Sequence, residues 1–90
     1  MKAADRLRVV ADGFAYLEAP RWHDDALWCA HWGAGEILRV DVDGTCEVAA
    51  AGPAGLGWAF SWLPDGRLVT TGESLLRHER DGTTVMHADL

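Results

Sequence analysis

The stretch LRVDVDG, residues 38–44, returns in similar form as LRHERDG, residues 76–82, which lies 38 positions further along the chain. Trp22 and Trp62 form an earlier match, 40 positions apart. Each copy reads as a tryptophan-bearing strand, an acidic turn, an apolar strand, a short turn, a Leu-Arg strand, an Asp-Gly hairpin and an outer strand. Four strands in a repeat of about 40 residues is the spacing of β-propeller blades.

Strand signals dominate the chain, and no segment has convincing helical periodicity. The segment 26–32 is apolar on both faces and is predicted as a central strand. The segment 36–42 alternates, with Leu38, Val40 and Val42 on one face. The remaining predicted strands around and after these two are 45–51, 67–72, 74–80 and 83–90. The predicted fold class is therefore all-β, with β-propeller blades built as two four-stranded antiparallel sheets.

This pattern divides the chain into a first blade over 14–51 and a second blade over 52–90. The segment 1–13 contains LRVVA, a short β-branched run that is predicted as an N-terminal strand and would complete the last blade of a ring. Propellers have about 4–8 blades, so residues 1–90 are expected to form a partial propeller, an incomplete fragment of a closed ring. A small β-sandwich is the alternative for seven or eight strands with regular turns.

Composition narrows the class of protein. The chain has 90 residues, of which 49% are hydrophobic and five are tryptophan, as expected for one small domain with a packed core. A net charge of -6 without a basic stripe disfavours nucleic acid and membrane partners. Cys29 and Cys46 are too few for a disulfide framework, and we expect free thiols in a reducing compartment. The opening lacks the apolar run of a signal peptide, so a cytoplasmic location is expected.

Four segments carry a resemblance to a known family. LEAPRWHDDALW (17–28), HWGAGEILRVDVDG (31–44), FSWLPDGRLV (60–69) and LLRHERDGTTVMHADL (75–90) together resemble the N-terminal third of the regucalcin (senescence marker protein)/gluconolactonase family. The resemblance implies a six-bladed propeller that hydrolyses sugar lactones, with one divalent metal, calcium or zinc, in its central channel. It also implies that the partner of the protein is a small-molecule lactone.

Glu18 matches the glutamate with which that family holds its metal, and the family's asparagine and aspartate ligands would fall beyond Leu90. One carboxylate does not hold a divalent cation, because calcium takes about 6–8 oxygen ligands. The resemblance thus implies that this chain is a fragment of a metal-dependent sugar-lactone hydrolase. We expect the chain alone to be inactive, with no stably bound metal and no catalytic residue of its own. The alternatives are a non-catalytic binding or self-assembling scaffold module, associating through open sheet edges, and an inactive truncation.

Other residues suggest chemistry less strongly. Cys29 and His31 lie two apart on one strand, hence on one face, and His23 is near in sequence. No third ligand has the spacing of a structural zinc site, so the roles of Cys29 and His31 stay open. Asp41-Val-Asp43-Gly resembles the start of a calcium loop, but its glycine comes too early and a hairpin turn is favoured. The tryptophans Trp22, Trp28, Trp58 and Trp62 are interpreted as packing between blades rather than as sugar-stacking platforms.

Overall fold

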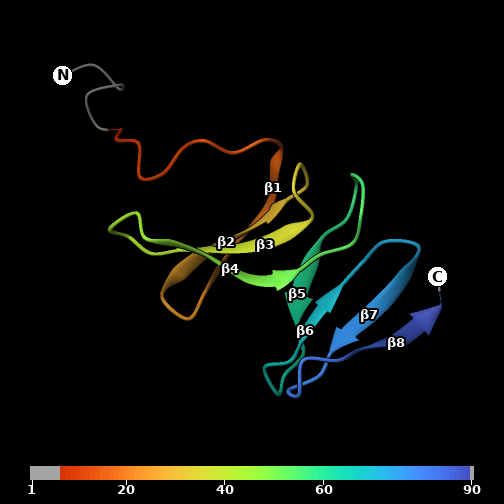
Figure 1. Cartoon of the computed structure of the whole chain (residues 1–90). Helices are drawn as coiled ribbons and strands as arrows, with labels where there is room; N and C mark the ends of the chain where they lie inside the picture. Colours follow the sequence, from red (N-terminus) through yellow and green to blue (C-terminus); the bar gives the residue numbers. More distant parts are fainter. Residues whose placement is uncertain (1–6, 90) are drawn as a thin grey trace.

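The computed structural model describes residues 7–89, which form two four-stranded antiparallel sheets without any helix in that range (Figure 1). The first sheet contains β1 (Leu17–His23), β2 (Ala26–His31), β3 (Glu36–Val40) and β4 (Cys46–Ala51). The second sheet contains β5 (Phe60–Trp62), β6 (Leu68–Thr70), β7 (Ser74–His78) and β8 (Thr84–Asp89). The strands of each sheet are paired in chain order. The described residues therefore include no segment that could cross a membrane as a helix, and the all-β prediction is confirmed.

The two sheets repeat each other in register as well as in sequence. Trp28 pairs with Arg39 between β2 and β3, and Val69 pairs with Arg77 between β6 and β7. The next ladder shifts register at Ile37/Leu38 in the first sheet and at Leu75/Leu76 in the second, again 38 residues apart. A bulge changes the twist and bend of a strand. Its recurrence at the equivalent place means that the sequence repeat produces two copies of one four-stranded unit.

The Asp-Gly dipeptides form the hairpins that the sequence predicts. In the first sheet, the Gly44 N–H donates to the Asp41 carbonyl, the Thr45 N–H donates to Asp43 Oδ1, and Gly44 has φ +90°. A left-handed φ of this kind favours glycine. The same three features recur at residues 79–83 of the second sheet. Because Asp43 caps its own turn, the segment 41–44 is a hairpin turn and not a calcium loop.

The main core lies between the two sheets. Ala30 and Ile37 of the first sheet pack against Trp58 and Phe60, and all four are almost completely buried. At one end of this interface, Trp62 stacks on His23 with ring centroids 3.7 Å apart. Trp62 also meets the ring of Trp28 edge-on at 5.1 Å. Aromatic pairs in these geometries add about 0.5–1.5 kcal/mol beyond their buried area, so the tryptophans at this interface are structural.

Trp22 is the exception among the predicted packing tryptophans. Its side chain is 64% exposed and lies on the face of the first sheet that points away from the second sheet. The equivalent residue, Trp62, is held between the sheets. Trp22 therefore occupies the position of an interface residue without a second sheet to cover it.

The N-terminal strand predicted within 1–13 is not formed over residues 7–13, and residues 1–6 lie outside the described range. The segment instead crosses the β3–β4 hairpin, where the Arg8 guanidinium donates to the Val42 carbonyl over 3.2 Å. The carbonyl of Val10 lies so close to Gly44 that a Cβ there would clash with it. A strand needs a ladder partner, and no strand within residues 7–89 pairs with this segment. Whether this segment completes a last blade stays a prediction.

Candidate functional site

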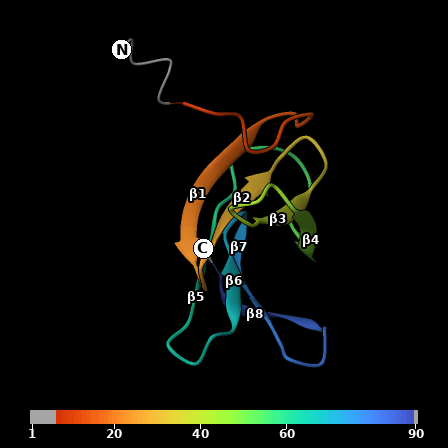
Figure 2. The ribbon, with the colours of Figure 1, turned by 90° about the vertical axis from the view of Figure 1, so that its left-hand side faces the viewer.

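Glu18, the predicted metal ligand, lies on β1, the edge strand of the first sheet (Figure 2). It pairs with Ala30 of β2, and the register of the ladder shifts between Glu18 and Arg21. Ala19, inside this irregularity, has φ +51°, and Pro20 follows it without a backbone N–H. Proline and a bulge are both features of edge strands. Glu18 is therefore an exposed carboxylate at an irregular point of an unpaired sheet edge.

No second ligand accompanies Glu18 within the described part of the chain. Residues 7–89 contain no group of three or more His, Cys, Asp or Glu side chains that could hold a metal ion. The ladder partner of Glu18 is Ala30 and the next residue is Ala19, and neither side chain has an oxygen or nitrogen atom to offer a metal. A carboxylate can supply one or two of the oxygen ligands of a hard cation, and the metal assignment stays a prediction.

His31 and Cys29 do not form a site with His23. Cys29 pairs with Leu38 in the middle of the first sheet, and burial raises the pKa of its thiol. His23 lies at the far end of β1, stacked on Trp62. The three zinc-ligand candidates are thus spread over the length of the sheet, and both cysteines are free.

His31 has a different structural role, which fastens the chain before β1. Its Nε2 accepts a hydrogen bond from the Ala15 N–H over 3.1 Å, and the ring of Phe14 packs edge-on against it at 5.5 Å. Nδ1 faces Glu36 Oε1 at 3.4 Å without a hydrogen bond in the described structure. Since Nε2 accepts, the proton of the neutral ring belongs on Nδ1, on the side of the carboxylate. This contact joins residues 14–15 to the ends of β2 and β3.

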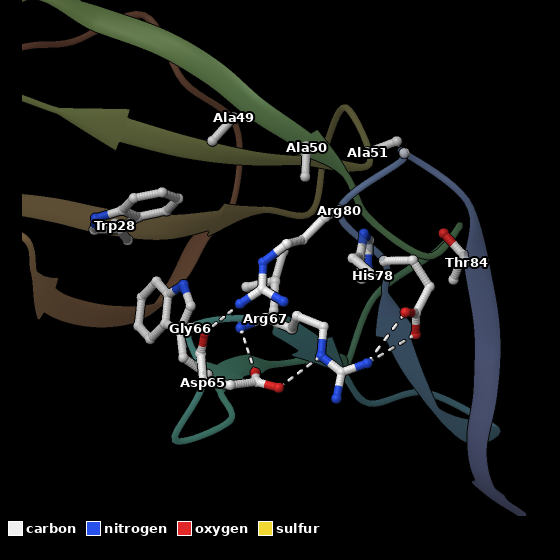
Figure 3. A pocket seen from close by; sticks show the side chains of 14 residues that line it. Trp28, Ala49, Ala50, Ala51, Asp65, Gly66, Arg67, His78, Arg80 and Thr84 are labelled. Carbon is white, nitrogen blue, oxygen red and sulfur yellow. Dashed lines mark hydrogen bonds and ion pairs between the residues drawn. The ribbon is translucent and has the colours of Figure 1, made fainter.

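A cleft with a volume of about 520 Å³ lies between the two sheets (Figure 3). One wall consists of Trp28 and the alanines of β4, and the opposite wall comes from the second sheet. The second wall carries polar side chains at the turns that end β5 and β7, including Asp65, Arg67 and His78. The sequence patterns do not predict this cleft. The only sequence signal for its polar wall is the charged residues of two segments, 65–67 and 77–80.

The charges along this cleft are largely matched with one another. Arg67 donates to Asp65 Oδ2 over 2.9 Å and to Glu79 Oε2 over 3.1 Å, and Arg77 also donates to Glu79. The backbone N–H of Arg67 lowers the pKa of Asp65, and the hydrogen bond from Arg77 lowers the pKa of Glu79. Burial lowers the pKa of His78. At neutral pH the wall therefore holds ionised carboxylates, paired arginines and a neutral imidazole.

This arrangement is suited to holding the turns together rather than to reaction chemistry. Each of these carboxylates already accepts hydrogen bonds from arginine, and His78 Nε2 lies 3.4 Å from the hydroxyl of Thr70. A nucleophile activated by an adjacent base would need a different pairing, with the base free to take a proton. The metal-assisted chemistry predicted from the sequence is assigned to Glu18 on β1 and stays a prediction.

No family model, no curated protein and no solved structure matches this chain. The resemblance to the regucalcin/gluconolactonase family consequently rests on the four sequence segments alone and stays a prediction.

Proposed function

We propose that the chain supplies two blades of a β-propeller that hydrolyses sugar lactones with the help of a divalent cation, calcium or zinc. In this proposal Glu18 contributes one oxygen ligand to the cation. The observation that carries it is the position of Glu18, exposed on the unpaired edge strand of a four-stranded unit that the chain repeats. Innermost strands line the channel of a propeller, where carboxylates from several blades can converge on one hard cation.

In such a reaction the chain's own role would be to hold the carboxylate of Glu18 at a fixed position on the wall of the channel. The bulge between Glu18 and Arg21 bends β1, and Pro20 restricts the backbone beside it. The contact of His31 with Ala15 fastens the residues just before β1. When bound, a divalent cation would polarise the lactone carbonyl and lower the pKa of a bound water.

The test is a chimera in which residues 14–89 replace the first two blades of a six-bladed sugar lactonase. We expect lactone hydrolysis that a chelator abolishes. Glu18→Gln keeps the shape of the side chain but removes its charge, and should lower both metal affinity and hydrolysis at least about tenfold, as loss of support to a metal site does.

Glu47→Gln is the matched control, since Glu47 is an exposed glutamate on the outer strand β4 and should leave both quantities unchanged. A folded chimera without hydrolysis would contradict the proposal. So would a chimera in which Glu18→Gln changes neither the metal affinity nor the rate of hydrolysis.

A further inference from the structure

The interface between the two sheets contains one face of each repeat unit. The first sheet contributes its inner face, which contains Trp28, Ala30 and Ile37. The second sheet contributes its near face, in which Trp62 and Leu68 pack against that core. Since the two sheets have the same register and the same bulge, each of these faces has an equivalent elsewhere in the chain.

The equivalents are the two faces that no sheet covers within residues 7–89. The near face of the second sheet is equivalent to the outer face of the first sheet. The pair Trp22 and Leu27 on the outer face occupies the same positions in the repeat as Trp62 and Leu68 on the near face. The inner face of the first sheet is equivalent to the far face of the second sheet, because Val69 pairs with Arg77 there as Trp28 pairs with Arg39. The described chain therefore presents both halves of its own interface, on opposite sides of the molecule.

The outer face of the first sheet is strongly apolar. Trp22 and Val42 are 64% and 65% exposed, and Val48 and Leu27 are also exposed. Together with Val10 and Phe14 of the N-terminal segment, this face forms an apolar groove of about 270 Å³. Contiguous exposed apolar surface on a small protein marks an interaction site.

The far face of the second sheet offers a suitable counterpart. Val69 and Leu75 lie at positions equivalent to Trp28 and Ile37 of the inner face. Arg77 also lies on this far face, but its charge is paired with that of Glu79 in the same chain, so it does not prevent docking. The existing interface tolerates the equivalent pair, in which Arg39 Nη1 lies 2.7 Å from Asp41 Oδ1.

We propose that the chain associates head to tail with copies of itself, so that the outer face of the first sheet of one copy docks on the far face of the second sheet of the next. The contact continues the sheet-to-sheet stacking already present within each chain, and it is independent of lactone hydrolysis. A head-to-tail contact closes into a ring when its rotation allows. Rings of about 4–8 sheets would contain two to four copies, and six sheets would contain three.

Two variants test the two faces separately. Trp22→Asp places a charge on the outer face of the first sheet, and Val69→Asp places one on the far face of the second sheet. Ala88→Arg is a second variant on the far face, in case Val69→Asp does not fold, because Ala88 is equivalent to Ala50 of the existing interface. Leu56→Asp is the control, since Leu56 is 63% exposed in the linker between the sheets.

Analytical ultracentrifugation of the purified 90-residue chain should give a multiple of the 9.8 kDa monomer mass for the wild type and for Leu56→Asp. Each face variant alone should sediment as a monomer with an unchanged far-ultraviolet circular dichroism spectrum. An equimolar mixture of the Trp22 variant and a far-face variant should form a dimer and nothing larger, because one intact face remains on each.

A wild-type chain that stays monomeric at every concentration would overturn the proposal. A far-face variant that assembles like the wild type would also overturn it, because the contact would then join two outer faces symmetrically.

Discussion

Gly52, which follows β4, lies directly against the buried ring of Trp58. A Cβ built on Gly52 would clash with Cη2 of that ring and would lie 2.6 Å from Cζ2 and 2.9 Å from Cζ3. Optimal contacts between carbon atoms lie at about 3.5–4.0 Å. The variant Gly52→Ala therefore requires the ring or the backbone to move by about 1 Å.

Trp58 has little freedom to make this movement. Its side chain is 2% exposed, and its Nε1 donates to the Gly55 carbonyl over 3.2 Å. Its own carbonyl accepts a hydrogen bond of 2.8 Å from Trp32 Nε1. Inserting atoms into a packed core costs about 1–3 kcal/mol, a large part of the roughly 5–13 kcal/mol expected for a domain of this size.

Gly72→Ala is the matched control. A Cβ on Gly72 would lie 3.8 Å from the Pro53 side chain, which is ordinary contact, and neither Gly52 nor Gly72 has a positive φ. Replacing glycine by alanine at a compatible site stabilises a protein by about 0.4–1 kcal/mol, because the unfolded chain loses freedom. The two variants should therefore shift the free energy of unfolding in opposite directions.

Urea unfolding, followed by tryptophan fluorescence and far-ultraviolet circular dichroism, measures both shifts. We expect a lower midpoint for Gly52→Ala, a slightly higher one for Gly72→Ala, and the same slope for all three proteins. Equal midpoints for the two variants would refute the packing of Trp58 against the end of β4.

Three further outcomes follow from the same structure. Trp62→Ala removes the stacking on His23 and the contact with Trp28, so the free energy of unfolding should fall by about 3–5 kcal/mol in urea titrations. Hydrogen bonds lower the pKa values of Asp65 and Glu79 in the folded protein from their ordinary values of 3.8 and 4.5. Both carboxylates therefore stabilise the fold at a pH above these ordinary values, and this stability is lost as the pH falls through the lower pKa values of the folded protein. Glu79→Gln should make the acid loss of stability less steep in titrations followed by circular dichroism. Cys46, which is exposed, should react with a thiol reagent in the folded protein, whereas Cys29, 6% exposed, should react only on unfolding; equal rates for the two would contradict the placement of β2.

The repeat can be predicted from the sequence because its turns and strands contain residues with strong local conformational preferences. Asp43-Gly44 and Asp81-Gly82 determine where the hairpins turn, and the alternating apolar residues before them determine which face is buried. Once both hairpins are placed, the equal spacing makes the two ladders equivalent. The register and the bulges follow from that equivalence.

Other features depend on partners that a local pattern does not specify. The run LRVVA has a high strand preference, yet over residues 7–11 it forms no strand, because a ladder needs a neighbouring edge. Trp22 and Trp62 look equivalent in sequence, but only Trp62 is covered. The hydrogen bond from the Ala15 N–H to His31 joins residues that are 16 positions apart, and no regular spacing in the sequence predicts it.

The same limit applies to Glu18. Its irregular edge position could be expected from the proline two residues later, since proline is confined to strand edges and bulges. The other ligands of a metal site would have to come from separate strands of a ring, and residues 7–89 contain no cluster that supplies them. The motif therefore predicts a ligand, whereas the site depends on the assembly of further sheets.

In the fold described above, two equivalent sheets stack with the inner face of the first against the near face of the second. Nuclear Overhauser contacts in the 90-residue chain test it most directly. We predict strong cross-peaks between the rings of His23 and Trp62, whose centroids lie 3.7 Å apart, and between Ile37 and the ring of Trp58. Cross-peaks that instead join Leu27 and Cys29 to the second sheet would show that the opposite face of the first sheet faces inward, and this stacking of the two sheets would then be wrong.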